Sequence, residues 1–197
     1  MTNAGVEELR HAGSGHPVPT ADEFFETFKG RCYINTDKAY SCFPQLVETI
    51  RRHNIMDQII LKGEVKDVKV YDMTEELAPD IPFLAVSYEE DTALEMCKGR
   101  NINYVGCEVV FTDENEGVGS TEFIDKLHAD NKLVWANAII YNYKSQLAAG
   151  HSDDTSFTIS PEYGWGWLAD RGYDIIQTDW TLAMCTYLNE TGKRFKK

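Results

Sequence analysis

Short apolar runs separated by helical stretches fill most of this sequence, and their regular alternation restricts its fold more than any other feature. The runs IILKG, FLAVSY and DIIQTD are continuous apolar segments, without a regular alternation of apolar and polar residues. Such runs are typical of a parallel sheet whose two faces are both covered by helices. We therefore expect an α/β fold with six strands, at residues 31–37, 57–63, 81–88, 103–111, 133–141 and 173–179.

The helical stretches lie between these strands. Thr20 followed three residues later by Glu23 is the pattern of a capping box, which predicts a helix start at Ala21. The segment FPQLVETIRRH repeats its apolar residues at helical spacing. The pattern predicts helices near residues 21–28, 43–53, 65–77, 91–98, 121–130, 161–170 and 181–191.

The order of these elements favours a barrel over a doubly wound sheet. Each strand except the last leads through a helix to another strand, and no Gly-rich Rossmann fingerprint follows the first strand. A complete barrel of this type has eight β/α units, so six strands leave it two short. We expect a single domain over residues 1–197, an incomplete TIM-type (β/α) barrel of about six parallel strands with outer helices.

The charge balance limits the classes of partner. Lys and Arg number 19 against 32 Asp and Glu, which gives a formal net charge of -13. The resulting field repels nucleic acid and anionic lipid headgroups, so neither is an expected partner. The same field repels a phosphodiester unless a bound cation or a local Lys reverses its sign inside a pocket.

Cysteine usage and the apolar segments bear on location. The five cysteines are widely spaced and form no Cys-x-x-Cys pair, so we interpret them as reduced thiols. Residues 1–16 lack the apolar run of a signal peptide, and no apolar stretch is long enough to span a bilayer. As given, the sequence predicts a cytoplasmic protein.

Three stretches carry a family resemblance: PTADEFFETFKGRCYINTDKAY (19–40), KLVWANAIIY (132–141) and GWGWLADRGYDIIQTDWTLAMCTYLNETG (164–192). They resemble the glycerophosphodiester phosphodiesterase family, which shows a Pro-Thr-x-x-Glu helix, a strand ending in Asn-x-Glu, a late Trp-x-x-Asn strand and a last strand closing on Thr-Asp. Counterparts of all four occur here in that order. The resemblance implies phosphoric diester hydrolysis in lipid and glycerol metabolism.

The resemblance also implies motifs that this sequence does not contain. The family barrel carries His-Arg-Gly and Glu-x-Asp on its first two strands, followed by a hairpin with a second His-Asp, and none of the three is present. The six expected strands are similar to the third through eighth strands of that barrel. We therefore expect a truncated barrel that lacks the family's acid–base histidines, with impaired or no activity as an isolated chain.

Asp37 is the position that matches the family's metal-binding Glu, which implies a divalent cation, Mg²⁺ or Ca²⁺. Asn35 and Asp37 are two residues apart in one expected strand and so face the same side, toward the active-site mouth of a barrel. An Asp that caps the following turn is the alternative. The Lys that follows the family's Glu by two residues is replaced by Ala39, with Lys38 displaced by one.

Two further charged residues interrupt or end apolar strands. Lys62 ends IILKG, where an ammonium group can meet a phosphate oxygen, although a solvated strand-end Lys is an equal alternative. Glu108 lies inside the apolar run VGCEVVF, where a carboxylate requires a Lys or a metal as partner. Both are candidate substrate-binding residues, and for Glu108 a structural salt bridge is the alternative.

Trp135 and Asn137 share one face of the run LVWANAI and loosely match the family's Trp-x-x-Asn strand. Trp135 is a candidate apolar wall for a glycerol moiety, with core packing as the alternative. His151, in a loop with Asp153 and Asp154, is a further candidate for contact with a metal or substrate.

Three functions remain open at this point. The chain is a metal-dependent phosphodiesterase, a non-catalytic module that binds a small phosphodiester or polyol, or a fragment that forms a homo-oligomer to complete its barrel. The last alternative follows from the tendency of unpaired strand edges to pair with another chain.

Overall fold

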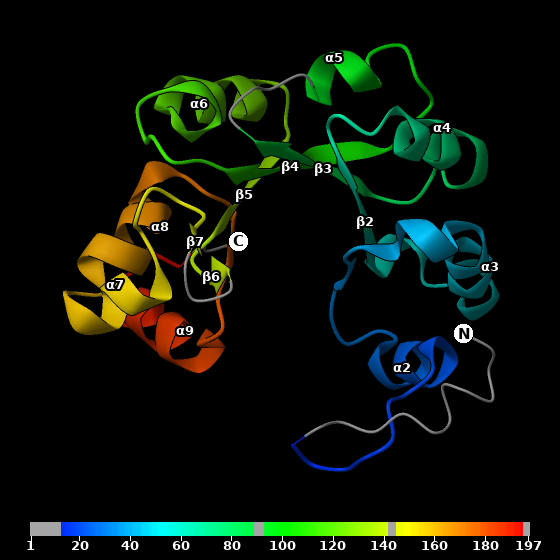
Figure 1. The fold of residues 1–197 in the computed structure, drawn as a ribbon, viewed down its shortest axis with the longest axis horizontal. Coiled ribbons are helices and arrows are strands. Elements are labelled where there is room, and N and C mark those ends of the chain that lie inside the picture. Colours follow the sequence, from blue (N-terminus) through cyan, green and yellow to red (C-terminus); the bar gives the residue numbers. More distant parts are fainter. Residues whose placement is uncertain (1–12, 89–92, 142–144, 195–197) are drawn as a thin grey trace.

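A six-stranded parallel sheet curled into a half-barrel organises the molecule, as the computed structural model shows for residues 13–88, 93–141 and 145–194 (Figure 1). The strands follow one another in the order β1-β2-β3-β4-β5-β8, and every neighbouring pair is parallel. The predicted α/β class and incomplete (β/α) barrel are thus confirmed. The strands are β1 (Ile34–Thr36), β2 (Ile59–Glu64), β3 (Phe83–Tyr88), β4 (Tyr104–Val110), β5 (Leu133–Asn137) and β8 (Ile175–Gln177).

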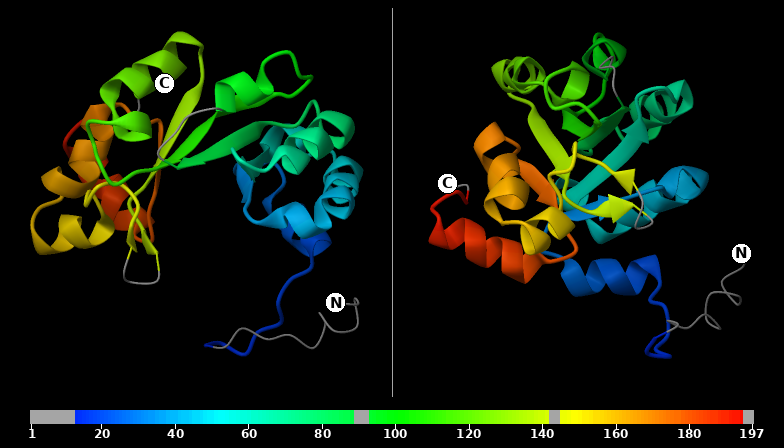
Figure 2. Two further views of the ribbon diagram at one scale, coloured as in Figure 1. Left: turned by 45° about the horizontal axis from the view of Figure 1, so that its top comes forward. Right: turned by 60° about the vertical axis from the view of Figure 1, so that its left-hand side comes forward.

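Helices cover the outer side of the curved sheet (Figures 1 and 2). The predicted bounds of the first two are confirmed, and the capping box is present, because Thr20 Oγ1 accepts from the backbone N–H of Glu23 while Glu23 accepts from that of Thr20. The helices are α2 (Ala21–Phe28), α3 (Phe43–His53), α4 (Val68–Leu77), α5 (Ala93–Cys97), α6 (Thr121–Ala129), α7 (Asp153–Thr158), α8 (Trp167–Arg171) and α9 (Thr181–Glu190). Residues 91 and 92 of the predicted fourth helix lie outside the described residues.

The segment between β5 and β8 differs most from the prediction. The expected strand over 133–141 ends at Asn137, and a small antiparallel hairpin of β6 (Ile140–Tyr141) and β7 (Ser145–Gln146) follows. The helix expected near 161–170 begins as a π-helical turn, η4 (Glu162–Gly166), and α7 was not predicted. The described residues also contain three short 3-10 turns, η1 (Ala39–Cys42), η2 (Met56–Gln58) and η3 (Gly117–Gly119).

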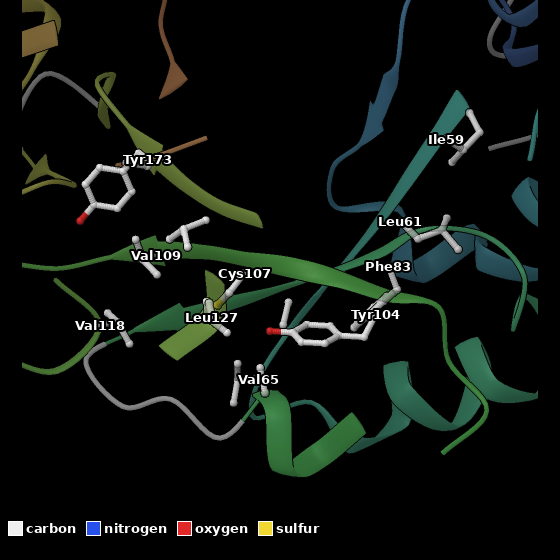
Figure 3. Close-up of a cluster of buried hydrophobic side chains, with 14 of the residues drawn as sticks. Ile59, Leu61, Val65, Phe83, Tyr104, Cys107, Val109, Val118, Leu127 and Tyr173 are labelled. Carbon is white, nitrogen blue, oxygen red and sulfur yellow. The ribbon is translucent and has the colours of Figure 1, made fainter. Parts of the chain in front are cut away.

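The main hydrophobic core lies between the convex face of the sheet and these helices. Leu61, Phe83 and Cys107 belong to it, each from a different strand (Figure 3). The strand register sets this face, because Leu61 is paired with Phe83 and alternate residues of a strand point to opposite sides. Leu84 and Val86, the neighbours of Phe83 and Ala85 in β3, therefore face the concave side.

The sheet has two free edges. In the part of the chain that the structure describes, β1 is paired only with β2 and β8 only with β5, so the curve does not close (Figure 2). The carboxyl ends of all six parallel strands lie at one rim of the half-barrel. No helix among the described residues is long and apolar enough to cross a membrane.

Candidate functional site

The cavity that draws most of the predicted residues together opens at the carboxyl-terminal rim of the sheet and has a volume of about 510 Å³. Residues at or just after the ends of β1, β2, β3, β4, β5 and β8 contribute to its wall, as does the β6–β7 hairpin. Its lining residues are Asn35, Asp37, Lys38, Lys62, Glu64, Val86, Tyr88, Glu108, Val110, Asn137, Ile139, Tyr141, Leu147 and Gln177. Four of the six residues predicted as site residues are in this set: Asp37, Lys62, Glu108 and Asn137.

A buried ion pair forms part of the cavity wall. Lys62 Nζ contacts Glu108 Oε2, and Asn137 Nδ2 donates to Glu108 Oε1 at 2.8 Å. Lys62 is 3% exposed, so the alternative of a solvated strand-end Lys is wrong. The pair joins β2 to β4 across β3. Glu108 thus forms the salt bridge that was the alternative for it, and its partner is Lys62.

Trp135 supports this pair from β5. Its strand position is in register with Glu108, and Lys62 Nζ lies 4.1 Å from the centroid of the Trp135 ring, close enough for a cation–π interaction. Trp135 is buried on the concave face, and its Nε1 has no hydrogen-bond partner among the described residues. It does not line the cavity itself, so its contact is with the ammonium group of Lys62.

Two carboxylates without protein partners lie at the cavity mouth. Asp37 follows β1 and Glu64 ends β2, and neither forms a hydrogen bond or ion pair within the described residues. The capping contact that was the alternative for Asp37 is therefore absent from this part of the chain. Lys38, in a left-handed conformation with φ 54°, directs its ammonium group toward the ring of Tyr141, with Nζ 5.6 Å from the centroid.

The pKa of Tyr88 reflects the negative charge at this cavity mouth. Burial raises the pKa of its hydroxyl, and the negative charges of Glu64, Glu108 and Asp37 raise the pKa further, in that order. Three carboxylates, one just after β1 and one each in β2 and β4, thus act on one side chain. Tyr88 is a neutral hydrogen-bond donor at ordinary pH.

The fit of a metal ion can be judged from the donor set. No group of three or more His, Cys, Asp and Glu side chains is arranged to hold a metal ion in residues 13–88, 93–141 and 145–194. Asp37 and Glu64 are the two carboxylates of the cavity wall without a partner in this part of the chain. Mg²⁺ in proteins is commonly bound by one or two carboxylates together with several waters.

His151 does not line the cavity. Its Nε2 lies 2.6 Å from Glu114 Oε2, its Nδ1 lies 2.6 Å from the carbonyl oxygen of Tyr163, and its ring stacks on Trp167 with centroids 3.6 Å apart. These contacts tie the loop before α7 to η4 and α8. The candidate substrate contact of His151 thus has no geometric link to the other site residues.

Asp153, the neighbour that sequence reasoning grouped with His151, is buried in a hydrogen-bond network. Its carboxylate accepts from Trp165 Nε1 at 2.6 Å, from the Thr178 hydroxyl at 2.7 Å and from the backbone N–H of Asp179 at 3.0 Å. All of these partners belong to the protein, so Asp153 fastens α7 to the end of β8. Asp154 is exposed on α7.

Glu64, Tyr88 and Tyr141 are among the cavity residues that sequence reasoning missed. Glu64 and Tyr88 were detectable, since Glu64 is two residues after Lys62 and Tyr88 closes the run FLAVSY, both at strand ends. Tyr141 was not, because it reaches the cavity through a hairpin that the sequence pattern did not indicate.

The comparison with known families adds one finding. Residues 81–188, just over half of the chain, match the profile of DUF4996, a domain of unknown function. The chain belongs to this family. The DUF4996 region runs from just before β3 into α9, so it includes Glu108, Trp135 and Asn137, whereas Asp37 and Lys62 precede it. None of the curated proteins matches the chain.

Proposed function

We propose that this chain is a glycerophosphodiester phosphodiesterase-like protein whose rim cavity binds a small phosphodiester or polyol. The observation that carries the proposal is the convergence of Asp37, Lys62 and Glu108, chosen from the sequence for this chemistry, on one cavity. The order of the motifs that resemble the phosphodiesterase family supports the same conclusion. The proposal implies a role in lipid and glycerol metabolism, in the cytoplasm, where the five cysteines remain free thiols.

The polar groups of the wall suit a hydroxylated ligand. Asn35, Asn137 and Gln177 come from three strands and provide amide donors and acceptors at the concave face. Apolar residues of the same wall can cover the carbon skeleton of a glycerol group, in the manner common to small-molecule sites. Hydroxyl groups and carbon atoms of one ligand thus find matching partners.

Binding of the phosphate end requires added positive charge. Lys62 is already paired with Glu108, and Asp37 and Glu64 bring two more negative charges to the mouth. We propose that a divalent cation, Mg²⁺ or Ca²⁺, held by Asp37 neutralises the phosphate. The affinity for a phosphodiester is then expected to depend on that cation.

The cavity is better suited to binding than to turnover. No histidine is among the residues that line it in the described part of the chain, and a general acid–base pair is what phosphodiester cleavage in the family uses. We therefore expect binding without substantial hydrolysis by this chain alone.

Calorimetric titration with glycerol 3-phosphate tests the proposal, in Mg²⁺ or Ca²⁺ and in chelator. Binding that needs the cation and falls at least about tenfold in Asp37→Asn is the expected result, because the loss of one cation ligand weakens phosphate neutralisation. Asp125→Asn, an exposed carboxylate on α6, serves as the matched control. Absence of binding by the native protein overturns the proposal.

A parallel assay separates binding from catalysis. The chain is mixed with a chromogenic phosphodiester and Mg²⁺ or Ca²⁺, beside an Asp37→Ala variant. We expect no metal-dependent turnover. Turnover that disappears in Asp37→Ala favours the enzyme and contradicts the binding-only function.

The free sheet edges favour a second candidate function, self-association. Tyr33 precedes β1 and Trp180 follows β8, and they are 74% and 56% exposed, so apolar side chains accompany both edges. Light scattering after size-exclusion chromatography is expected to give a mass above 22.4 kDa that Trp180→Ser lowers. Tyr163→Ser, an exposed tyrosine on η4, is the control, and a monomer at all concentrations excludes this candidate.

A further inference from the structure

We propose that His151 positions one side of the rim cavity through a bridge that forms only when the ring and its partners hold an additional proton. The His151 bridge is the pair of contacts that the two ring nitrogens make with Glu114 and with the backbone carbonyl of Tyr163. The inference goes beyond the proposed function, because it concerns a side chain outside the cavity and does not depend on the ligand. It makes His151 a positioning residue whose effect changes with pH.

The two contacts of the bridge need more than one donor. His151 Nδ1 lies 2.6 Å from the carbonyl oxygen of Tyr163, and Nε2 lies 2.6 Å from Glu114 Oε2. A neutral imidazole has a single N–H, and neither a carbonyl nor an ionised carboxylate can donate. Both contacts are hydrogen bonds only if one more proton is present, either on the ring, as imidazolium, or on the carboxyl group of Glu114.

The surroundings of the ring suit a positive charge. The ring of Trp167 stacks on that of His151 with centroids 3.6 Å apart, and the face of an indole ring attracts cations. The carboxylate of Glu114 brings a negative charge into direct contact. Arg171 on α8 carries the opposing positive charge, and its guanidinium group donates to the backbone carbonyls of Glu114 and Gly119.

Other charged groups on the elements around the ring have partners elsewhere or face solvent. Asp153 is enclosed in its own hydrogen-bond network at the end of β8. Glu162 and Asp170 both form ion pairs with Lys193. The exposed titratable side chains nearby are Asp113, Glu116, Asp154 and Tyr163. In this part of the chain, the carboxylate in contact with the ring is thus that of Glu114.

The bridge is connected to the wall of the rim cavity through backbone hydrogen bonds. Leu147 lines the cavity, and its carbonyl accepts from the backbone N–H of Phe111, the residue after β4. The backbone N–H of Ala149 donates to the carbonyl of Phe111 at 3.1 Å, and that of His151 donates to the carbonyl of Ala148 at 2.9 Å. A change at the His151 ring therefore acts on the segment that contains Leu147.

The turn that directs His151 toward its partners is not favoured by its own sequence. Ala149 has φ 49° and Gly150 has φ 95°, so both lie in the left-handed region. A residue with a Cβ is uncommon there, and contacts with the surroundings must hold it in place. Loss of one contact of the bridge allows this turn to relax, and Leu147, two residues before Ala149, to shift with it.

The bridge is expected to be complete at lower pH and to open as the pH rises. Histidine is the side chain whose ordinary titration lies between about pH 5 and 8. Once the additional proton is lost, the remaining N–H donates to Glu114, because hydrogen bonds to carboxylates are the stronger ones. The lone pair of Nδ1 then faces the carbonyl oxygen of Tyr163, and the ring separates from η4.

An NMR titration of the ligand-free protein between about pH 5.5 and 8.5 tests the inference. The backbone amides of Leu147, Ala149 and Gly164, which follows the carbonyl of Tyr163, are expected to shift with the same midpoint as the ring of His151. The hydrogen-exchange protection of the Ala149 amide is expected to be about three- to tenfold lower at the upper pH, which corresponds to the loss of about one hydrogen bond.

Three variants locate the source of these changes. His151→Gln removes the titrating ring and is expected to abolish the pH-dependent shift of Ala149. His128→Gln is the matched control, since His128 also contacts a carboxylate, that of Asp174 at 3.0 Å, and its loss is expected to leave the shift of Ala149 unchanged. Glu114→Gln keeps an acceptor but removes the negative charge, so the midpoint is expected to move to lower pH.

Two results in the NMR titration overturn the inference: an Ala149 amide that does not shift while the His151 ring titrates, and one that shifts equally in His151→Gln. An unchanged midpoint in Glu114→Gln also overturns it, and this variant decides the question if His151→Gln does not fold. Thermal unfolding establishes which variants are folded. Because no ligand is present, these results are independent of whether glycerol 3-phosphate binds to the cavity.

Discussion

The two faces of the half-barrel are built from the same six strands but have opposite chemistry. The convex face contributes Leu61, Phe83 and Cys107 to a continuous apolar core against the helices. The concave face carries the ion pair of Lys62 and Glu108, one strand residue away from those core side chains. Because side chains alternate along a strand, a single strand supplies both the core and the candidate site.

The sequences of the strands follow from this difference between the two faces. A parallel sheet with both faces buried favours continuous apolar runs. The runs here are apolar except where their concave-side residues border the cavity. Apart from Ser87 of β3, the buried polar residues of these strands are Lys62, Glu108 and Asn137, and all three face the same hollow. Their burial is costly unless their polar atoms have partners, which they provide for one another.

The largest expected effect tests the convex face. Phe83→Ala removes a fully buried ring that packs edge-on against Tyr71, with ring centroids 5.3 Å apart. We expect the free energy of unfolding to fall by about 3 to 5 kcal/mol. Urea denaturation measures it, with Leu84→Ala as the counterpart on the concave face, expected to cost about 2 kcal/mol. A larger cost for Leu84→Ala would reverse the assignment of the main core.

On the concave face, removal of one member of the ion pair is expected to lower the free energy of unfolding more than removal of both. Lys62→Met leaves the carboxylate of Glu108 buried without its cation, and we expect a loss of about 3 kcal/mol. The double variant Lys62→Met, Glu108→Leu is expected to lose less than about 1 kcal/mol relative to the native protein. Urea denaturation measures the free energy of unfolding of both variants. If the single and the double variant lost the same amount, the attraction within the pair would be what stabilises the fold.

The smallest expected effect lies on the exposed surface, away from both faces. Arg51 binds the carboxylate of Asp80 with two hydrogen bonds, of 2.6 and 3.0 Å, and thereby holds the pKa of Asp80 below its ordinary value of 3.8. A lowered pKa stabilises the folded state above pH 3.8, and that contribution is lost as the pH falls through the folded-state pKa. Since both side chains are about half exposed, the pair contributes roughly 0.2 to 1 kcal/mol.

Asp80→Asn measures this contribution through urea unfolding at pH 7 and at pH 2.5. The variant is expected to be less stable than the native protein at pH 7, and the difference is expected to shrink at pH 2.5. A difference of the same size at both pH values would show that the carboxylate's charge is not its cause.

The sequence predicted the regular part of this molecule well for a physical reason. Apolar periodicity and the Thr20 capping box are local signals, and they located all six strands and the starts of α2 and α3. The convergence of Asp37 and Lys62 also followed, because the carboxyl ends of parallel strands must meet at one rim.

The remaining parts depend on contacts between distant residues. Tyr141 enters the cavity from a two-residue strand that pairs with β7 and is too short to leave a periodic signal. His151 and Asp153 have the composition of a polar site, yet they bind Glu114, Trp165 and Thr178, which are between 12 and 37 residues away. Such partners cannot be deduced from local sequence.

The most direct test of the account is an NMR titration of the native protein with glycerol 3-phosphate and Mg²⁺. We expect the resonances of the Asn137 side-chain amide and the Lys62 ammonium group to shift together, while those of the backbone amides of Phe83 and Cys107 on the convex face shift much less. Shifts confined to the helices or to the loop of His151 would contradict it, because the ligand would then bind outside the concave face.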